Sequence, residues 1–279
     1  MLSLQFTMSI VALISDLGTK DHYVSLVKAS LLNHNPTIIP VDISHEIGPG
    51  EIGDAAFLFR SVWNNFPFGS VFINGVSSYK QAGREHIIIE YQDRYLITAD
   101  NGVFSLMFPE AQSDEYKIYL LNIEGAEDIR FPMSGVFAMA AAQITQGNLP
   151  DQWCERLSSL KKIKGLEPYM NGQDLVTQVI YVDHFGNLYF NLTKKLFEEV
   201  GKGRSFAIPV RAQTTINKFH ERFADVEIGS EVAFWGQNDY LVISMNRDGG
   251  GERAGTFSRL MNLALGDSLT ISFHGDANR

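Results

Sequence analysis

IVALISDLGTKD, residues 10–21, is the stretch that decides the fold. Its first five residues are apolar and rich in β-branched side chains, which is typical of a strand buried on both faces of a sheet. The segment SDLG then supplies turn-forming residues, and Tyr23, Val27 and Leu31 recur at helical spacing, with Asp21 as the expected N-cap. A strand that leads through a short loop into a helix begins a strand–helix–strand unit, so we predict a parallel sheet.

The same alternation continues through the first half of the chain. Pro36 ends the first expected helix, and the clearest helix of all is closed by Gly147 as its C-cap. The pattern predicts an α/β N-terminal domain with a mainly parallel sheet and helices on its faces. The further expected strands are 38–43, 71–73, 86–91, 95–98 and 116–122, and the further expected helices are 53–63, 101–108 and 135–146.

The second half of the chain has a different pattern. Residues 152–166 carry the densest charge of the chain and are interpreted as a linker, with solvated lysines. We therefore predict two domains, 1–168 and 172–279, the second being a smaller all-β, barrel-like domain. Its expected strands are short and separated by turn residues: 176–182, 188–192, 205–210, 231–235, 241–245 and 268–273.

Composition narrows the classes of function. The 279 residues carry a net charge of −9, which argues against nucleic acid as a partner. Cys154 is the one cysteine, so no internal disulfide forms; it is interpreted as a small packed side chain, and the chain as cytoplasmic. No apolar run approaches about 20 residues, so no membrane span is predicted, and the apolar N-terminus is interpreted as a strand instead of a signal peptide.

Several loops carry residues suited to binding a ligand. Asp16 follows the first strand, where open α/β sheets bind ligands, and a carboxylate pairs well with the two vicinal hydroxyls of a ribose. Asp183 and Asn187 lie in the loop DHFGN between two strands of the second half. Phe223 precedes a carboxylate, and Asn246 follows a strand. Taken singly, each of these also fits a plain turn or cap.

Other patterns exclude particular sites. Gly249, Gly250 and Gly251 lack the spacing of a P-loop or a dinucleotide fingerprint. No set of His, Cys and carboxylate residues has the spacing of metal ligands, so no metal is predicted.

Taken together and in order, six segments point to one family. SDLGTKDHYV, VDISHEI, ADNGVFSL, YVDHFGNLYFNL, RFAD and ISMNR resemble the superfamily of S-adenosylmethionine (SAM) hydroxide adenosyltransferases, fluorinases and chlorinases. The resemblance covers nearly the whole chain. It implies a homotrimer in which each site lies between the N-terminal domain of one subunit and the C-terminal domain of its neighbour. There SAM would be attacked at ribose C5′ by water or halide, with methionine as the leaving group.

The resemblance also implies roles for individual residues. Asp16 would hold the ribose hydroxyls, and Asp21 would lie near the amino acid end of SAM. Phe223 would stack near adenine and Asn246 would hydrogen-bond its edge. Asp183 and Asn187 would contact the methionine part. Tyr189, from the same segment, is the remaining substrate-binding position.

The chain departs from the family at the nucleophile site. The water-using branch has an Asp-Arg-His set; here Ser77 stands at the Asp position, Arg84 keeps the Arg position and Pro132 stands at the His position. Serine and proline do not take up a proton near pH 7, so water activation is altered. His86 and His184 are the other histidines considered, and neither aligns with the missing one. Ser77 and Arg84 are the candidate catalytic residues, and Arg84 and Lys80 would place positive charge there.

A second departure concerns the wall of the SAM pocket. Some halogenases of the family carry a Trp in a P-W-D-V-like segment, whereas this chain has Gly50.

The leading hypothesis is a divergent SAM-binding protein that cleaves SAM to adenosine and methionine. Its alternatives are a non-catalytic protein that binds or senses an adenosyl ligand and, third, a SAM-dependent halogenase. No prosthetic group is expected, because SAM would be the substrate or ligand itself.

Overall fold

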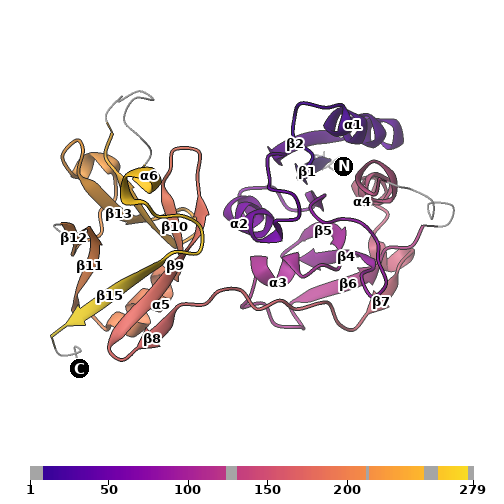
Figure 1. The fold of residues 1–279 in the computed structure, drawn as a ribbon. Helices are drawn as coiled ribbons and strands as arrows, with labels where there is room; N and C mark the ends of the chain where they lie inside the picture. Colours follow the sequence, from indigo (N-terminus) through magenta and orange to yellow (C-terminus); the bar gives the residue numbers. More distant parts are fainter. Residues whose placement is uncertain (1–8, 124–130, 212–213, 248–256, 276–279) are drawn as a thin grey trace, which may run out of the picture. The chain divides into compact units, whose positions relative to one another are not determined.

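A computed structural model describes residues 9–123, 131–211, 214–247 and 257–275. The chain divides into two compact units, Met1–Lys164 and Gly165–Arg279, each with its own sheet (Figure 1). The N-terminal octapeptide and the glycines 249–251 lie outside the described residues.

The first unit is built on a seven-stranded sheet. Strand β1 is buried along its whole length at the centre of the parallel half, as its apolar run predicts. The order is β2-β1-β3-β5-β4-β6-β7; the first four strands run parallel, and the last three are added antiparallel. The strands are β1 (Ile10–Ile14), β2 (Ile39–Ser44), β3 (Val71–Asn74), β4 (His86–Tyr91), β5 (Arg94–Ala99), β6 (Tyr116–Leu120) and β7 (Glu155–Leu157).

Helices cover both faces of this sheet (Figure 1). Helices α1 (Tyr23–His34) and α4 (Ala138–Thr145) pack on the face that presents Val11 and Leu13. On the other face, α2 (Ile52–Trp63) and α3 (Val103–Met107) pack against a second apolar cluster. Alternate residues of β1 point to opposite faces, so one strand serves both cores, and the predicted α/β class is confirmed.

Three expectations from the sequence need correction. His22, without a side-chain cap hydrogen bond, precedes α1, so Asp21 is not the N-cap. The helix expected over 135–146 begins later, at Ala138, because Met133–Phe137 form a π-helical turn with non-helical angles at Gly135. Residues 152–166 are not merely a linker, because β7 and the short turn Pro150–Gln152 belong to the first unit.

The second unit is an eight-stranded, wholly antiparallel sheet around a single core, which confirms the predicted barrel-like all-β class. Its strand order is β12-β11-β15-β9-β10-β14-β13, with β8 paired to β9. The strands are β8 (Tyr169–Asn171), β9 (Asp174–Val182), β10 (Leu188–Thr193), β11 (Ser205–Arg211), β12 (Thr214–Ile216), β13 (Glu231–Trp235), β14 (Tyr240–Met245) and β15 (Ser268–His274).

In the described part of this unit, two short α-helices accompany the sheet. They are α5 (Lys194–Gly201), capped by the Thr193 side chain on Leu196 N–H, and α6 (Phe257–Met261). Neither is expected from the sequence pattern. Across the described residues of both units, every helix is too short or too polar to cross a lipid bilayer.

Candidate functional site

The carboxyl ends of the parallel strands place the first group of candidate residues along one edge of the sheet. Ile14 pairs with Ser44 and with Asn74, so the loops that follow β1, β2 and β3 begin side by side. Strand β4 runs the opposite way and starts at the same edge, because His86 pairs with Ala99. The loops carrying Asp16, Ser77 and Arg84 therefore share this edge, where open α/β sheets bind ligands.

The Asp16 loop is tied to the loop after β2. Ser15 N–H donates to the Ser44 carbonyl at 3.0 Å, and Gly18 N–H donates to the His45 carbonyl at 2.7 Å. The carboxylate of Asp16 accepts from Gly50 N–H through Oδ2 at 3.0 Å, and within the described part of the chain no donor reaches its Oδ1. Gly50 thus contributes its N–H to holding Asp16 in place.

A hydrogen-bonded chain of side chains lies beneath this loop and is not assigned by the sequence. Ser15 Oγ lies 2.6 Å from His45 Nδ1, and His45 Nε2 lies 3.1 Å from Asp42 Oδ1. Lys28 of α1 reaches the other oxygen of Asp42 at 2.5 Å. Burial raises the pKa of Asp42, but the hydrogen bonds and charges of Lys28 and His45 outweigh it, so the pKa lies below its usual value. The only sequence signal was the segment VDISHEI, which contains Asp42 and His45.

Among the described side chains, Asp21 makes no hydrogen bond or ion pair with Asp16. It is exposed in the bend that precedes α1. Since His22 takes the position before the helix, the capping role that competes with ligand binding does not apply to Asp21.

Ser77 and Arg84, the candidates for the nucleophile site, are brought into direct contact. Arg84 Nη1 donates to Ser77 Oγ at 3.0 Å. Ser77 adopts a φ of 52°, a left-handed conformation that is uncommon outside glycine and concentrates at functional sites. Arg84 Nε is buried and, among the described residues, has no hydrogen-bond partner. Lys80 is instead paired with Glu85 at 2.6 Å.

His86 and His184 have different surroundings. His86 is buried, and its Nε2 lies 2.8 Å from the Ser78 carbonyl, which only accepts, so Nε2 carries a proton. Burial lowers the pKa of His86 and outweighs the hydrogen bond to Ser78, which leaves the ring neutral near pH 7. His184 is exposed beside Phe185 in the loop of the second unit.

Pro132, predicted from the sequence to replace a family histidine, begins the turn that leads into α4. It is the N-cap residue of the π-helical turn and supplies no proton-accepting side chain. The next residue, Met133, packs so closely on the end of β3 that a Cβ at Gly75 would lie 2.0 Å from its sulfur. This segment therefore packs directly against the start of the loop that carries Ser77.

In the second unit, the loop between β9 and β10 is held by Asp183 and Asn187. Asp183 Oδ1 accepts from the N–H groups of Phe185 and Asn187, each at 2.9 Å, and Oδ2 accepts from Asn187 Nδ2 at 2.7 Å. Ser244 of β14 donates to Asn187 Oδ1. Both side chains therefore hold the turn, and ligand binding by Asp183 and Asn187 stays a prediction.

The other three candidates of this unit lie around the same end of the sheet. Tyr189 pairs with Val242 across β10 and β14, and burial, followed by the charge of Asp183, raises its pKa. Asn246 follows β14, and its Nδ2 donates to the Val226 carbonyl at 2.7 Å. Phe223 is 41% exposed and packs edge-on against Phe234, with centroids 4.9 Å apart.

Phe185 is a candidate that sequence reasoning missed. It is 72% exposed at the tip of the loop that Asp183 holds, whereas most rings of this size are buried in the core. An exposed ring on a fixed loop is suited to stacking on a flat ligand. The signal was the aromatic residue inside DHFGN.

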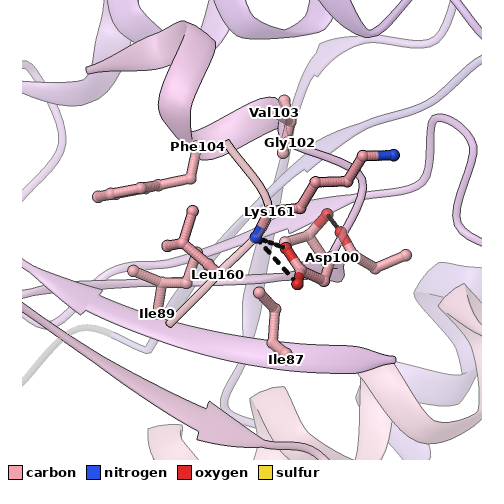
Figure 2. A pocket seen from close by; sticks show the side chains of 10 residues that line it. Ile87, Ile89, Asp100, Gly102, Val103, Phe104, Leu160 and Lys161 are labelled. Atoms are coloured by element: carbon pink, nitrogen blue, oxygen red, sulfur yellow. Dashed lines mark hydrogen bonds between the residues drawn. The ribbon is translucent and has the colours of Figure 1, made fainter. Parts of the chain in front are cut away.

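Asp100, in the segment ADNGVFSL, has a structural role. Both of its oxygens accept from Lys161 N–H, at 2.9 and 3.1 Å, as Figure 2 shows. The hollow around this contact is lined by Ile87, Phe104 and Leu160 and does not admit a water-sized sphere. Beside it, Gly102 has a φ of 92°, and a Cβ there would meet Ile163 at 2.5 Å. The segment clamps residues 160–163 onto the first unit.

Asp100→Asn is expected to leave the free energy of unfolding at about pH 7 unchanged or raised, because the amide oxygen still accepts from Lys161 and no charge is desolvated. Asp100→Ala loses the acceptor and is expected to cost about 1 kcal/mol. Burial raises the pKa of Asp100, so its contribution to stability is most favourable below the unfolded pKa and is lost as pH rises through the folded pKa.

The advantage of the Asn variant should therefore shrink as the pH is lowered. Urea unfolding of the three proteins at neutral and mildly acidic pH measures it. Equal destabilisation by Asn and Ala would contradict the clamp.

No group of three or more His, Cys, Asp or Glu residues in the described ranges is arranged to hold a metal ion.

Comparison with known proteins places these residues in context. Residues 11–153 match the family model described as SAM hydroxide adenosyltransferase N-terminal domain, and residues 177–270 match the corresponding C-terminal domain. One similar protein is an (R)-S-adenosyl-L-methionine hydrolase of Thermus thermophilus, 26% identical over 88% of this chain and 95% of that protein. Another of the same name, from Methanocaldococcus jannaschii, is 28% identical over 67% of this chain and 68% of that protein.

A fluorinase of Nocardia brasiliensis is also similar, 23% identical over 94% of this chain and 96% of its own length. Among solved structures, an uncharacterised conserved protein from Thermotoga maritima has the same fold, with a TM-score of 0.80 at 24% identity over 94% of this chain and 99% of that chain.

Proposed function

The chain belongs to the SAM hydroxide adenosyltransferase family, and from that premise we propose that it binds SAM and cleaves it to adenosine and methionine. The observation that carries the proposal is the Asp16 loop. It lies at the carboxyl edge of the parallel sheet and presents a fixed carboxylate whose Oδ1 is left without a donor among the described residues. A carboxylate so placed accepts hydrogen bonds from the two ribose hydroxyls of an adenosyl group.

The reaction proposed is a displacement at ribose C5′. A water oxygen forms a bond to C5′ as the C5′–sulfur bond breaks, and the electron pair passes to sulfur. The sulfonium thereby becomes the neutral thioether of methionine, and the attacking water gives up one proton to solvent. Because sulfonium is already a good leaving group, alignment of water and its removal from bulk solvent supply most of the required catalysis.

Ser77 and Arg84 are proposed to hold the attacking water. The guanidinium donates to Ser77 Oγ at 3.0 Å, which leaves the serine's own O–H to donate to a neighbour. Neither group removes a proton at neutral pH, so the step lacks the factor of about 10²–10⁴ that a general base contributes. The expected enzyme is therefore slower than relatives that keep the full Asp-Arg-His set.

We propose that the second group of residues comes from a neighbouring subunit of a homotrimer. Asp183, Asn187 and Asn246 gather at one end of the β unit, and the Asp183 charge suits the cationic methionine end of SAM. The family resemblance supports this division of the site between two subunits.

A second candidate function is binding without turnover. It is favoured by the expectation from the sequence that Ser77 and Pro132, neither of which accepts a proton near pH 7, replace the family's Asp and His. In that case, the protein would sense SAM or a related adenosine compound.

The test is a product analysis in water enriched in heavy oxygen. Purified protein is incubated with SAM, with and without chloride or fluoride. The products are separated by chromatography and identified by mass spectrometry. Adenosine with heavy oxygen on its 5′ position is the expected product, at a rate independent of halide. A 5′-halo-adenosine would identify a halogenase, calorimetric binding without product would identify a sensor, and no binding at all would overturn the proposal.

A further inference from the structure

We propose that Ser15, His45 and Asp42 form a positioning chain that fixes the ribose-binding loop. This series of hydrogen bonds begins at the buried Ser15, one position before Asp16. It ends at the surface, where Lys28 pairs with Asp42. The inference rests on the proposed function because the loop it fixes is the one that would bind the adenosyl ribose.

The hydrogen bonds of the chain have one consistent direction. The Asp42 carboxylate only accepts, so His45 Nε2 carries a proton and donates to it. In the tautomer that carries its single proton on Nε2, Nδ1 accepts from Ser15 Oγ, which lies 2.6 Å away. Leu17 N–H is the donor that reaches Ser15 Oγ, at 3.4 Å. The position of the loop backbone is thereby coupled to the histidine.

A Ser–His–Asp set usually indicates a nucleophile, but the geometry here excludes that role. The side chain of Ser15 is 0% exposed, at the end of a wholly buried strand, so no substrate reaches its oxygen. His45 is buried as well, 4% exposed. These residues touch the loop and not a ligand, so they act through Asp16.

Ser15 and Asp42, the two hydrogen-bond partners of His45, would be affected differently by its loss. The Asp42 side chain is 39% exposed and keeps its contact with Lys28, so water replaces a lost partner there at little cost. Ser15 is buried, and its hydroxyl would be left without an acceptor, which is the expensive case. The bond between His45 and Ser15 is therefore the one that holds the loop.

Two substitutions separate these ends. In His45→Asn, the amide takes the position of Nδ1 and keeps a partner for Ser15; in His45→Gln, it reaches the position of Nε2 and keeps only the partner for Asp42. Gln is larger than Asn and replaces more of the ring volume, so a role in packing alone would favour Gln. The proposed role favours Asn. His34→Gln, at the exposed C-terminal end of α1, is the matched control.

Three measurements are made on each protein: thermal unfolding, SAM affinity by calorimetry, and deuterium uptake of the peptide spanning residues 15–21 without ligand. His45→Gln is expected to weaken SAM binding about tenfold and to speed exchange at residues 17 and 18, whereas His45→Asn and His34→Gln stay within about threefold of the parent. Ser15→Ala should match His45→Gln.

The outcomes distinguish this inference from the proposed function. If the parent protein does not bind SAM, the proposed function fails. The exchange rates still decide whether the hydrogen bonds among Ser15, His45 and Asp42 hold the loop. If His45→Gln binds SAM and protects the loop at least as well as His45→Asn, the positioning role is wrong.

Discussion

Replacing Asp16 by alanine is expected to abolish measurable SAM binding. The carboxylate sits at the end of β1, anchored by Gly50 N–H, where it would accept from both ribose hydroxyls. Hydrogen bonds to a charged group contribute about 1.5–3 kcal/mol each, so loss of two of them weakens binding by at least about a hundredfold. Calorimetric titration with SAM measures the effect.

The matched control for this prediction is Asp93→Asn. Asp93 lies in the tight turn between β4 and β5 with a φ of 57°, a conformation that Asn tolerates well. It removes one negative charge from the same unit, so a general effect of net charge on a cationic ligand would appear in both variants. If Asp16→Ala bound SAM as tightly as the control, Asp16 would not be the ribose ligand.

Mixing two inactive variants is expected to restore activity if each site is shared between subunits. In the proposed trimer, Asp16→Ala removes the N-terminal contribution to every site and Asp183→Ala removes the C-terminal contribution. In randomly mixed trimers, a site is intact only where the subunit that supplies the N-terminal half carries Asp183→Ala and the neighbour that supplies the C-terminal half carries Asp16→Ala. This combination occurs at about one quarter of interfaces. Co-expression of the two variants and an assay for adenosine test this directly.

Asp183→Ala carries a complication, because the carboxylate also holds its own turn. Asp183→Asn is therefore run in parallel, since an amide oxygen still accepts from the backbone of the loop while the charge is lost. Recovery with either partner supports a shared site. Two variants that are each inactive, assemble together and show no recovery would place both halves within one subunit.

The fold was predictable because its strongest signals are local. The run IVALI is buried along its whole length, and the later change from strand–helix alternation to short strands marks the antiparallel unit. The family resemblance is confirmed by the match of both family models, whereas the roles of Asp16, Asp183 and the other candidates remain predictions.

What the sequence did not predict depends on contacts between distant residues. Strand β7 has three residues and forms only because an edge of the sheet is available to it beside β6. Helix α5 lies within a run of strands, and its cap, Thr193, is also the last residue of β10. The link from Ser15 to His45 spans thirty positions and arises because β1 and β2 are neighbours in the sheet.

The self-contained turn at 183–187 also has a kinetic consequence. Four of its polar contacts are made within the turn or to Ser244, so its shape does not depend on an incoming molecule. A surface that is already rigid loses little conformational entropy on association. Encounters with ligand should then follow a single fast phase, and differences in affinity among turn variants should be found mainly in how quickly the ligand leaves.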